Sequence, residues 1–255
     1  MTDPDLRFTT RDGRRLAYRF RPAHPMPRTA PTMVFLPGYM SDMTGGKATA
    51  LDTWAAATGH AMLRFDYGGC GESDGEFAEQ TLEDWRDDVL YLMRMILEGP
   101  VILVGSSMGG WLMLLIALAR PERVKGIIGI AAAPDFTGWG FSDAERRTLA
   151  TGGMLSEPGF DPDQPYITTA KFWRSGEANR LLGGAIDIDC PVRLLHGQAD
   201  TDVPFDISLQ IADQVTTKDV VVTLVKDGDH RLSRDEDIER LIETVAALVV
   251  SASED

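Results

Sequence analysis

GSSMGG, residues 105–110, stands between a short apolar run over 101–104 and a longer apolar stretch over 111–119. This pattern predicts a strand, a sharp turn and a helix, with Ser107 at the apex of a G-x-S-x-G turn. The flanking glycines let such a strained turn close without collisions. The helix that follows directs unpaired N–H groups and a partial positive charge at the serine hydroxyl. An exposed hydroxyl beside oriented donors is half of an acyl-transfer site. The alternative is a purely structural glycine turn.

Composition limits the classes of protein to consider. The chain has 255 residues, 44% of them hydrophobic, and a formal net charge of −14. This length predicts a single α/β domain over 1–255. The acidity argues against nucleic-acid and anionic-membrane partners, because both require basic patches. No apolar run reaches transmembrane length. We therefore expect a protein that binds a small or acylated substrate, and the sequence leaves its oligomeric state open.

The cysteines and the first residues bear on compartment and cofactors. Cys70 and Cys190 stand in no metal-binding or C-x-x-C spacing, which predicts free thiols in a reducing compartment. The opening MTDPDLRF has the pattern of neither a signal peptide nor a transit peptide. We therefore expect a cytoplasmic protein with no metal and no cofactor.

A hairpin followed by alternating strand and helix patterns predicts the fold. Two alternating runs, 6–10 and 15–20, flank Asp12-Gly13, and a proline-rich connector follows them. Its prolines are Pro22, Pro25, Pro27 and Pro31. Further strands are expected over 32–36, 60–67, 101–105, 124–132, 192–196 and 220–225, and helices over 47–58, 81–96, 108–119, 206–215 and 234–250. This order predicts an α/β fold with a mostly parallel eight-stranded sheet and helices on both faces.

The strand and helix pattern is interrupted from about 134 to 189, which is too long for a plain connection. Aromatic residues stand among its glycines and prolines: Trp139, Phe141, Phe160, Tyr166, Phe172 and Trp173. We predict a small, partly helical lid over the strand ends. The alternative is a surface insertion that packs its own aromatic side chains. An apolar acyl pocket is expected from Trp139, Phe141, Phe172 and Trp173, with Met40 and Met108 near its mouth. The alternative for these side chains is the core of the lid.

A serine nucleophile needs a base, and the chain has four histidines. In a parallel sheet, ligands lie at the carboxyl ends of the strands. His24 lies in the connector and His60 opens a strand, so neither is expected at that edge. His196 ends a strand and is expected to hydrogen bond with nearby backbone. His230, in the loop DGDH after the last strand, is the predicted base.

A carboxylate must orient the base, and a pair of N–H groups must bind the oxyanion. Asp200 and Asp202 both follow the 192–196 strand, and the spacing HGxxDxxVP favours Asp200 as the acid. Asp202 is then expected in a turn or at a helix start. The predicted oxyanion donors are the amide of Met108 and, in the loop LPGY, the amide of Tyr39.

The glycine-rich segment 65–75, FDYGGCGESDG, leaves a strand at the same edge of the sheet. No helix follows it directly, so a phosphate-binding loop is not expected. We predict that this segment forms a shaped loop that supports the loop LPGY, residues 36–39, which we call the oxyanion loop. Asp66 is expected to be a structural hydrogen-bond acceptor there.

Taken together, LPGY, RFDYGGCGESDG, VGSSMGG, LLHGQADTDVP and DGDH resemble the α/β-hydrolase superfamily over nearly the whole chain. More narrowly, 38–75 followed by 105–111 resembles the subfamily of α/β-hydrolase domain-containing protein 10, which contains palmitoyl-protein thioesterase and acyl-glucuronide esterase activity. The resemblance implies a serine hydrolase of acyl esters or thioesters, with Ser107 as nucleophile, Asp200 as acid and His230 as base. Two alternatives stay open: an acyltransferase or other triad chemistry on this fold, and a non-catalytic ligand receptor.

Overall fold

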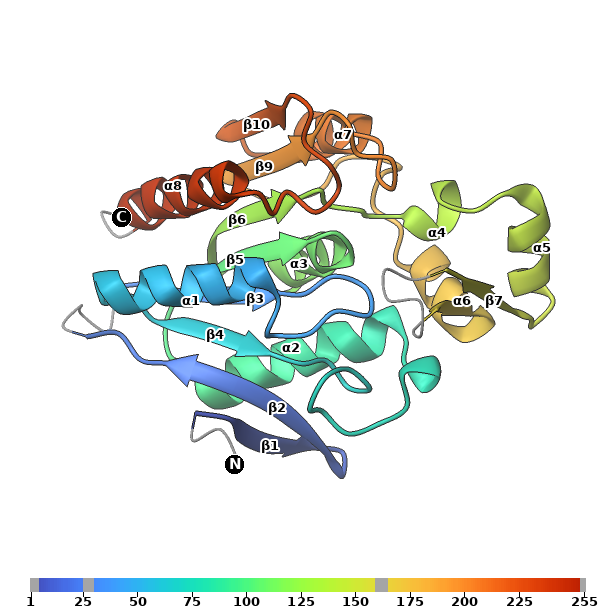
Figure 1. The fold of residues 1–255 in the computed structure, drawn as a ribbon, viewed down its shortest axis with the longest axis horizontal. Helices are drawn as coiled ribbons and strands as arrows, with labels where there is room; N and C mark the ends of the chain where they lie inside the picture. The colour runs from blue at the N-terminus through green and yellow to red at the C-terminus, as the bar shows by residue number, and fades with distance from the viewer. Residues whose placement is uncertain (1–4, 25–29, 159–164, 253–255) are drawn as a thin grey trace.

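One sheet organises the molecule, which is described here from a computed structural model covering residues 5–24, 30–158 and 165–252 (Figure 1). Its eight strands lie in the order β1-β2-β4-β3-β5-β6-β9-β10. They are β1 (Arg7–Arg11), β2 (Arg14–Arg21), β3 (Thr32–Leu36), β4 (Met62–Phe65), β5 (Val101–Ser106), β6 (Val124–Ile130), β9 (Val192–Gly197) and β10 (Val220–Val225). The β1–β2 and β2–β4 pairs are antiparallel, and all the other pairs of this sheet are parallel. The predicted sheet is therefore confirmed.

Helices cover both faces of this sheet (Figure 1). They are α1 (Gly46–Thr58), α2 (Leu82–Ile96), α3 (Met108–Ala119), α7 (Asp206–Gln214) and α8 (Asp235–Ser251). Buried residues of α1 and α8 share one hydrophobic core, and those of α2, α3 and α7 share the other. The apolar character of α3 follows from its position, because it is buried nearly all round against the sheet and α2.

Local sequence signals set several element boundaries. Helix α1 ends at Gly59, whose φ of 80° is the left-handed conformation that glycine adopts readily. Helix α2 begins with a capping box in which Thr81 and Asp84 exchange hydrogen bonds. The strand expected over 60–67 is shorter, because β4 covers only four residues before its chain turns into the glycine-rich loop. Pro25 and Pro27 of the connector lie outside the described residues.

The interruption between β6 and β9 contains α4 (Phe136–Trp139), α5 (Asp143–Ala150), β7 (Met154–Glu157), β8 (Tyr166–Thr169) and α6 (Ala170–Ala178). We call this segment the insertion. Its two strands form a separate antiparallel hairpin, and the insertion lies beyond the carboxyl ends of the central strands (Figure 1). Phe160 lies outside the described residues.

The two ends of the insertion are tied together by one carboxylate. Asp135, at its start, is 1% exposed and accepts hydrogen bonds from the amides of Leu181 (2.7 Å) and Leu182 (2.8 Å), just after α6. These hydrogen bonds hold together the two segments that connect the insertion to the sheet.

Within the described residues, no helix combines the length and apolar character that a membrane crossing requires.

Candidate active site

Ser107 occupies the strained turn that its glycine pattern predicts. It joins β5 to α3 with φ 54° and ψ −119°, a backbone conformation that side-chain-bearing residues rarely adopt. The end of β6 holds this turn, because the Ser107 amide donates to the Ile130 carbonyl (2.9 Å) and the Ala133 amide donates to the Ser107 carbonyl (3.1 Å). The strain thus turns the serine hydroxyl out from the carboxyl edge of the sheet.

Gly109 explains why the helix can start so close to the neighbouring strand. A Cβ at this position would lie 2.1 Å from the Leu36 carbonyl oxygen and 2.5 Å from that of Pro37. These are backbone atoms, so no side chain can move aside. The absence of a side chain at Gly109 therefore sets the distance between α3 and the loop that follows β3.

Asp200 lies in the turn after β9, and its carboxylate has four hydrogen-bond donors around it. Its Oδ1 accepts from the amides of Asp202 and Val203, both at 2.9 Å. Its Oδ2 lies 2.8 Å from Nδ1 of His230 and 3.2 Å from Nε2 of His196. Burial by itself raises the pKa of Asp200, but the hydrogen bonds from both histidines and from Val203 outweigh burial and hold the pKa well below its ordinary value. Asp200 is therefore ionised at neutral pH.

His230 lies in the loop between β10 and α8, and glycine packing brings this loop to the Asp200 turn. A Cβ at Gly197 would lie 2.1 Å from the Gly228 carbonyl oxygen, and that oxygen accepts the Ala199 amide at 2.9 Å. On the other side of His230, the ammonium group of Lys47 in α1 donates to the Arg231 carbonyl at 2.5 Å. The loop is therefore fixed both to the sheet and to α1.

The three predicted side chains form a continuous hydrogen-bonded line. Nε2 of His230 lies 3.2 Å from the Ser107 hydroxyl, and the side chain of His230 is 22% exposed. Because a carboxylate only accepts, Nδ1 of His230 carries the proton, which leaves Nε2 free to accept from Ser107. This arrangement can take a proton from the hydroxyl and hold the resulting imidazolium beside a carboxylate.

His196 also contacts Asp200, a contact that the sequence did not predict. It is fully buried, and its Nε2 lies 3.0 Å from the Val203 carbonyl as well as near Asp200. Both neighbours are acceptors, so Nε2 carries the proton, and Nδ1 accepts from the Ser208 hydroxyl at 2.7 Å. The predicted bond to nearby backbone is confirmed. The second bond, to Asp200, depends on how the turn after β9 folds back.

Two backbone N–H groups beside Ser107 have no acceptor in the described part of the chain. They belong to Tyr39 and to Met108, and neither donates a hydrogen bond to any described residue. The loop carrying Tyr39 lies against the turn, since a Cβ at Gly38 would be 3.5 Å from Cβ of Ser107. Met40 adopts φ 53° as this loop bends away. Two backbone donors near the turn at Ser107 therefore remain available, and their role as an oxyanion hole stays a prediction.

The segment 65–75 supports this loop, as predicted. Asp66 is 1% exposed and accepts hydrogen bonds from the amides of Met43 (2.7 Å) and Glu72 (2.9 Å). The hydroxyl of Tyr67 donates to the Pro37 carbonyl at 3.2 Å. Asp66 is thus the structural acceptor that the sequence indicated, and it joins the two loops.

The residues predicted to line an acyl pocket differ in burial. Phe172 is 2% exposed and packs against Tyr39, Trp85 and Phe136, so it lies in the core between the insertion and the rest of the protein. The other four are half-buried: Met40, Trp139, Phe141 and Trp173. Met108, predicted near the mouth of the pocket, is 1% exposed and lies in the same hydrophobic core as Phe172. Phe172 and Met108 are thus packed core residues, and for the half-buried four a role in a pocket stays a prediction.

Asp200, Asp202 and His230 offer oxygen and nitrogen atoms within 4.8 Å of one another, a spacing that a metal ion also requires. Hydrogen bonding within the described residues accounts for this geometry, because His230 is hydrogen bonded to Asp200 and Asp202 is exposed.

Both cysteines are free thiols, and burial raises the pKa of Cys70 to about 12 and that of Cys190 to about 11. Neither thiol is therefore a nucleophile at neutral pH.

Comparison with known proteins agrees with this fold. Residues 31–154 match the family described as alpha/beta hydrolase fold. Human palmitoyl-protein thioesterase ABHD10, mitochondrial, is 42% identical over 224 residues, which span 86% of this chain and 73% of the relative. The mouse protein of the same name is 44% identical over 223 residues, with 86% and 75% covered.

Solved structures give the same result. Mouse α/β hydrolase domain-containing protein 10 superposes with a TM-score of 0.88 at 41% identity, covering 96% of this chain and 98% of that one. A putative hydrolase from Agrobacterium vitis S4 also gives 0.88, at 39% identity, with 96% and 97% covered. The sheet, the flanking helices and the insertion are therefore shared with these relatives.

The prediction of a cytoplasmic protein is contradicted by these comparisons and is wrong. The human and mouse relatives are both named as mitochondrial proteins. The prediction relied on free thiols and on the pattern of the first residues, and free thiols do not distinguish one reducing compartment from another. Because the matches to these relatives cover most of both chains, the protein belongs to the α/β-hydrolase family.

Proposed function

We propose that this protein is a serine hydrolase that cleaves carboxylic esters or thioesters through an acyl-enzyme on Ser107. The observation that carries the proposal is the hydrogen-bonded line from Ser107 through His230 to Asp200, with spacings of 3.2 Å and 2.8 Å. Membership of a hydrolase family, with relatives named thioesterases, supports the same conclusion.

In the proposed reaction, His230 takes the proton of Ser107 as the hydroxyl oxygen attacks the carbonyl carbon. The negative charge then moves to the carbonyl oxygen, and the amides of Tyr39 and Met108 bind it. The tetrahedral intermediate collapses as the bond to the leaving alcohol or thiol breaks, and His230 returns the proton to that group. Water, activated by the same imidazole, then hydrolyses the acyl-serine. Asp200 keeps His230 in the required tautomer throughout.

The insertion is proposed to act as a lid that binds the acyl chain. Asp135 holds together the two segments where the insertion begins and ends. The aromatic side chains of the insertion reach the oxyanion loop: the ring centroids of Phe136 and Tyr39 are 6.0 Å apart, and those of Phe136 and Phe141 are 6.3 Å apart. A carbonyl group bound at Ser107 would thus have apolar side chains on one side. This favours an apolar acyl group, and the long acyl chain in the relatives' name fits the same chemistry.

A fluorophosphonate probe tests the nucleophile. We expect the folded protein to take up one probe molecule, because phosphonylation requires a serine activated by a base and an oxyanion site. Intact mass and peptide mapping should place the adduct on Ser107, while its neighbour Ser106 stays unmodified. Acid-unfolded protein is the control and should not react. An adduct on another residue, or a folded protein that stays unlabelled while hydrolysing esters, would contradict the proposed mechanism.

Acyl-chain length tests the apolar site. With matched p-nitrophenyl esters and thioesters from acetyl to octanoyl, we expect kcat/KM to rise with chain length, by up to about fourfold for each CH₂ buried. Steady-state kinetics below the critical micelle concentration measure this. A preference for acetyl would contradict an apolar acyl site. Acyl transfer to an added thiol in place of hydrolysis would favour the acyltransferase alternative.

A further inference from the structure

Tyr39 belongs to two parts of the molecule at once. Its backbone amide is one of the two N–H groups beside Ser107 that donate to no described residue, and its side chain contacts the insertion. There the phenol hydroxyl donates to the carbonyl of Ile167 in β8, at 2.5 Å. Burial raises the pKa of Tyr39, so the hydroxyl keeps its proton and remains a donor. One residue thus joins the oxyanion loop to the hairpin of the insertion.

The ring of Tyr39 is enclosed by aromatic side chains from both parts of the fold. Phe77 and Trp85 come from the segment before α2 and from α2 itself, with ring centroids 5.1 Å and 5.9 Å away. Phe136 and Phe172 come from the insertion, at 6.0 Å and 5.0 Å. Such packing leaves the ring little freedom to move alone. A displacement of the insertion must therefore move the ring, the hydroxyl or both.

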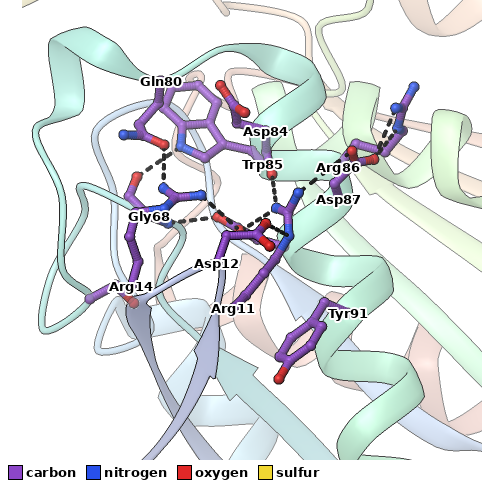
Figure 2. Close-up of polar contacts among 12 residues, drawn as sticks. Arg11, Asp12, Arg14, Gly68, Gln80, Asp84, Trp85, Arg86, Asp87 and Tyr91 are labelled. Carbon is purple, nitrogen blue, oxygen red and sulfur yellow. Dashed lines mark hydrogen bonds and ion pairs between the residues drawn. The ribbon is translucent and has the colours of Figure 1, made fainter.

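Polar contacts hold the other side of this cluster in place (Figure 2). The indole N–H of Trp85 donates to the Gly68 carbonyl at 3.0 Å, and the Gly68 amide donates to Asp88, which is fully buried, at 2.9 Å. Arg11 donates to the same carboxylate at 2.6 Å. Trp85 is thus anchored by hydrogen bonds to the main fold, whereas Phe136 and Phe172 contact Tyr39 from the insertion.

We propose that Tyr39 is a positioning residue through which the insertion sets the geometry of the oxyanion hole. The hydroxyl bond to Ile167 holds the side chain, the side chain fixes the orientation of the residue, and the amide is thereby aimed at the developing oxyanion. The neighbouring Met40 has φ 53°, a conformation that residues with a side chain rarely adopt, so the backbone is strained one residue after Tyr39. The inference rests on the proposed function and adds a coupling between the insertion and the chemical step.

The test is the variant Tyr39→Phe, which removes the hydroxyl and keeps the ring. We expect kcat for a short p-nitrophenyl ester to fall about tenfold with KM changed less than about twofold, because the lost geometry matters in the transition state. The inhibition constant of an alkylboronic acid, whose tetrahedral adduct on Ser107 places an oxygen at the oxyanion position, should rise by a similar factor.

Tyr91→Phe is the matched control. The hydroxyl of Tyr91, a residue of α2 (Figure 2), also donates to a backbone carbonyl at 2.5 Å, but to that of Thr10 in β1. The control should leave kcat and boronate affinity unchanged. If Tyr39→Phe keeps wild-type kcat and boronate affinity, or if both variants lose the same activity, the inference is overturned. A wild-type protein with no turnover and no label on Ser107 would instead refute the proposed function.

A measurement on the unmodified protein gives an independent result. Coupling is reciprocal, so occupying the oxyanion hole must also stabilise the hairpin that Tyr39 contacts. Hydrogen exchange with and without the boronic acid should show slower exchange of the amides of β8. Unchanged exchange in β8, with a boronate adduct demonstrated on Ser107, would overturn the inference even if Tyr39→Phe failed to fold.

Discussion

Replacing Asp200 by asparagine is expected to lower kcat by about three to four orders of magnitude, the size of effect found when a triad carboxylate becomes an amide. The change keeps the size of the side chain but replaces one acceptor oxygen by an NH₂ donor. The effect follows from the four donors that surround this carboxylate, which are two backbone amides at Oδ1 and two imidazole nitrogens at Oδ2.

An amide at position 200 can satisfy only one of these two pairs. If its oxygen faces the amides of Asp202 and Val203, its NH₂ group faces Nδ1 of His230. Nδ1 must then accept, so the proton moves to Nε2, and His230 can no longer take the proton of Ser107. His196 cannot adapt in the same way, because its Nε2–H is needed by the Val203 carbonyl. The NH₂ group therefore also meets a second donor, and we expect stability to fall along with kcat.

Kinetics and thermal unfolding separate these two effects. The measurement is kcat for a short p-nitrophenyl ester at neutral pH, with Ser107→Ala giving the background of the assay. Asp202→Asn is the control, since Asp202 is exposed and only its backbone amide contacts Asp200; it should retain nearly full activity. A folded Asp200→Asn variant within tenfold of the wild-type kcat would show that Asp200 does not orient His230.

Sequence alone predicted the parts of the site that depend on local geometry. The turn at Ser107 is encoded by glycines that are needed within a few residues, because strand, turn and helix fit together only without Cβ atoms there. The spacing from His196 to Asp200 is likewise a property of one turn. His230 was separable from His196 because one lies on a loop and the other at a strand end.

Contacts between distant segments had no such signal. The hydroxyl of Tyr39 meets the carbonyl of Ile167 across 128 residues, and no pattern near either residue indicates the pairing. Phe172 has the composition of a pocket residue, yet it is buried, because the burial of an aromatic ring depends on which segments fold over it. The error in the predicted compartment has a different origin, since the fold and its active site do not encode a cellular address.

Replacing Gly109 by alanine is expected to destabilise the protein by about 3 kcal/mol or more, a large effect for adding one methyl group. The new Cβ would lie 2.1 Å from the Leu36 carbonyl oxygen and 2.5 Å from that of Pro37, where van der Waals contact requires more than 3 Å. Relief requires α3 to move away from the end of β3. For a chain of this length, we expect the melting temperature to fall by about 6–12 °C, which calorimetry measures.

The same substitution should reduce activity beyond its effect on stability. Pro37 leads into the loop that carries the Tyr39 amide, and α3 carries Ser107 and the Met108 amide at its start. Separating α3 from that loop therefore moves the two oxyanion donors apart. At a temperature where the variant is fully folded, we expect kcat to fall at least about tenfold. Gly46→Ala is the control, because a Cβ at the start of α1 meets no atom within 4 Å. Equal behaviour of the two variants would mean that close packing at Gly109 does not hold the site together.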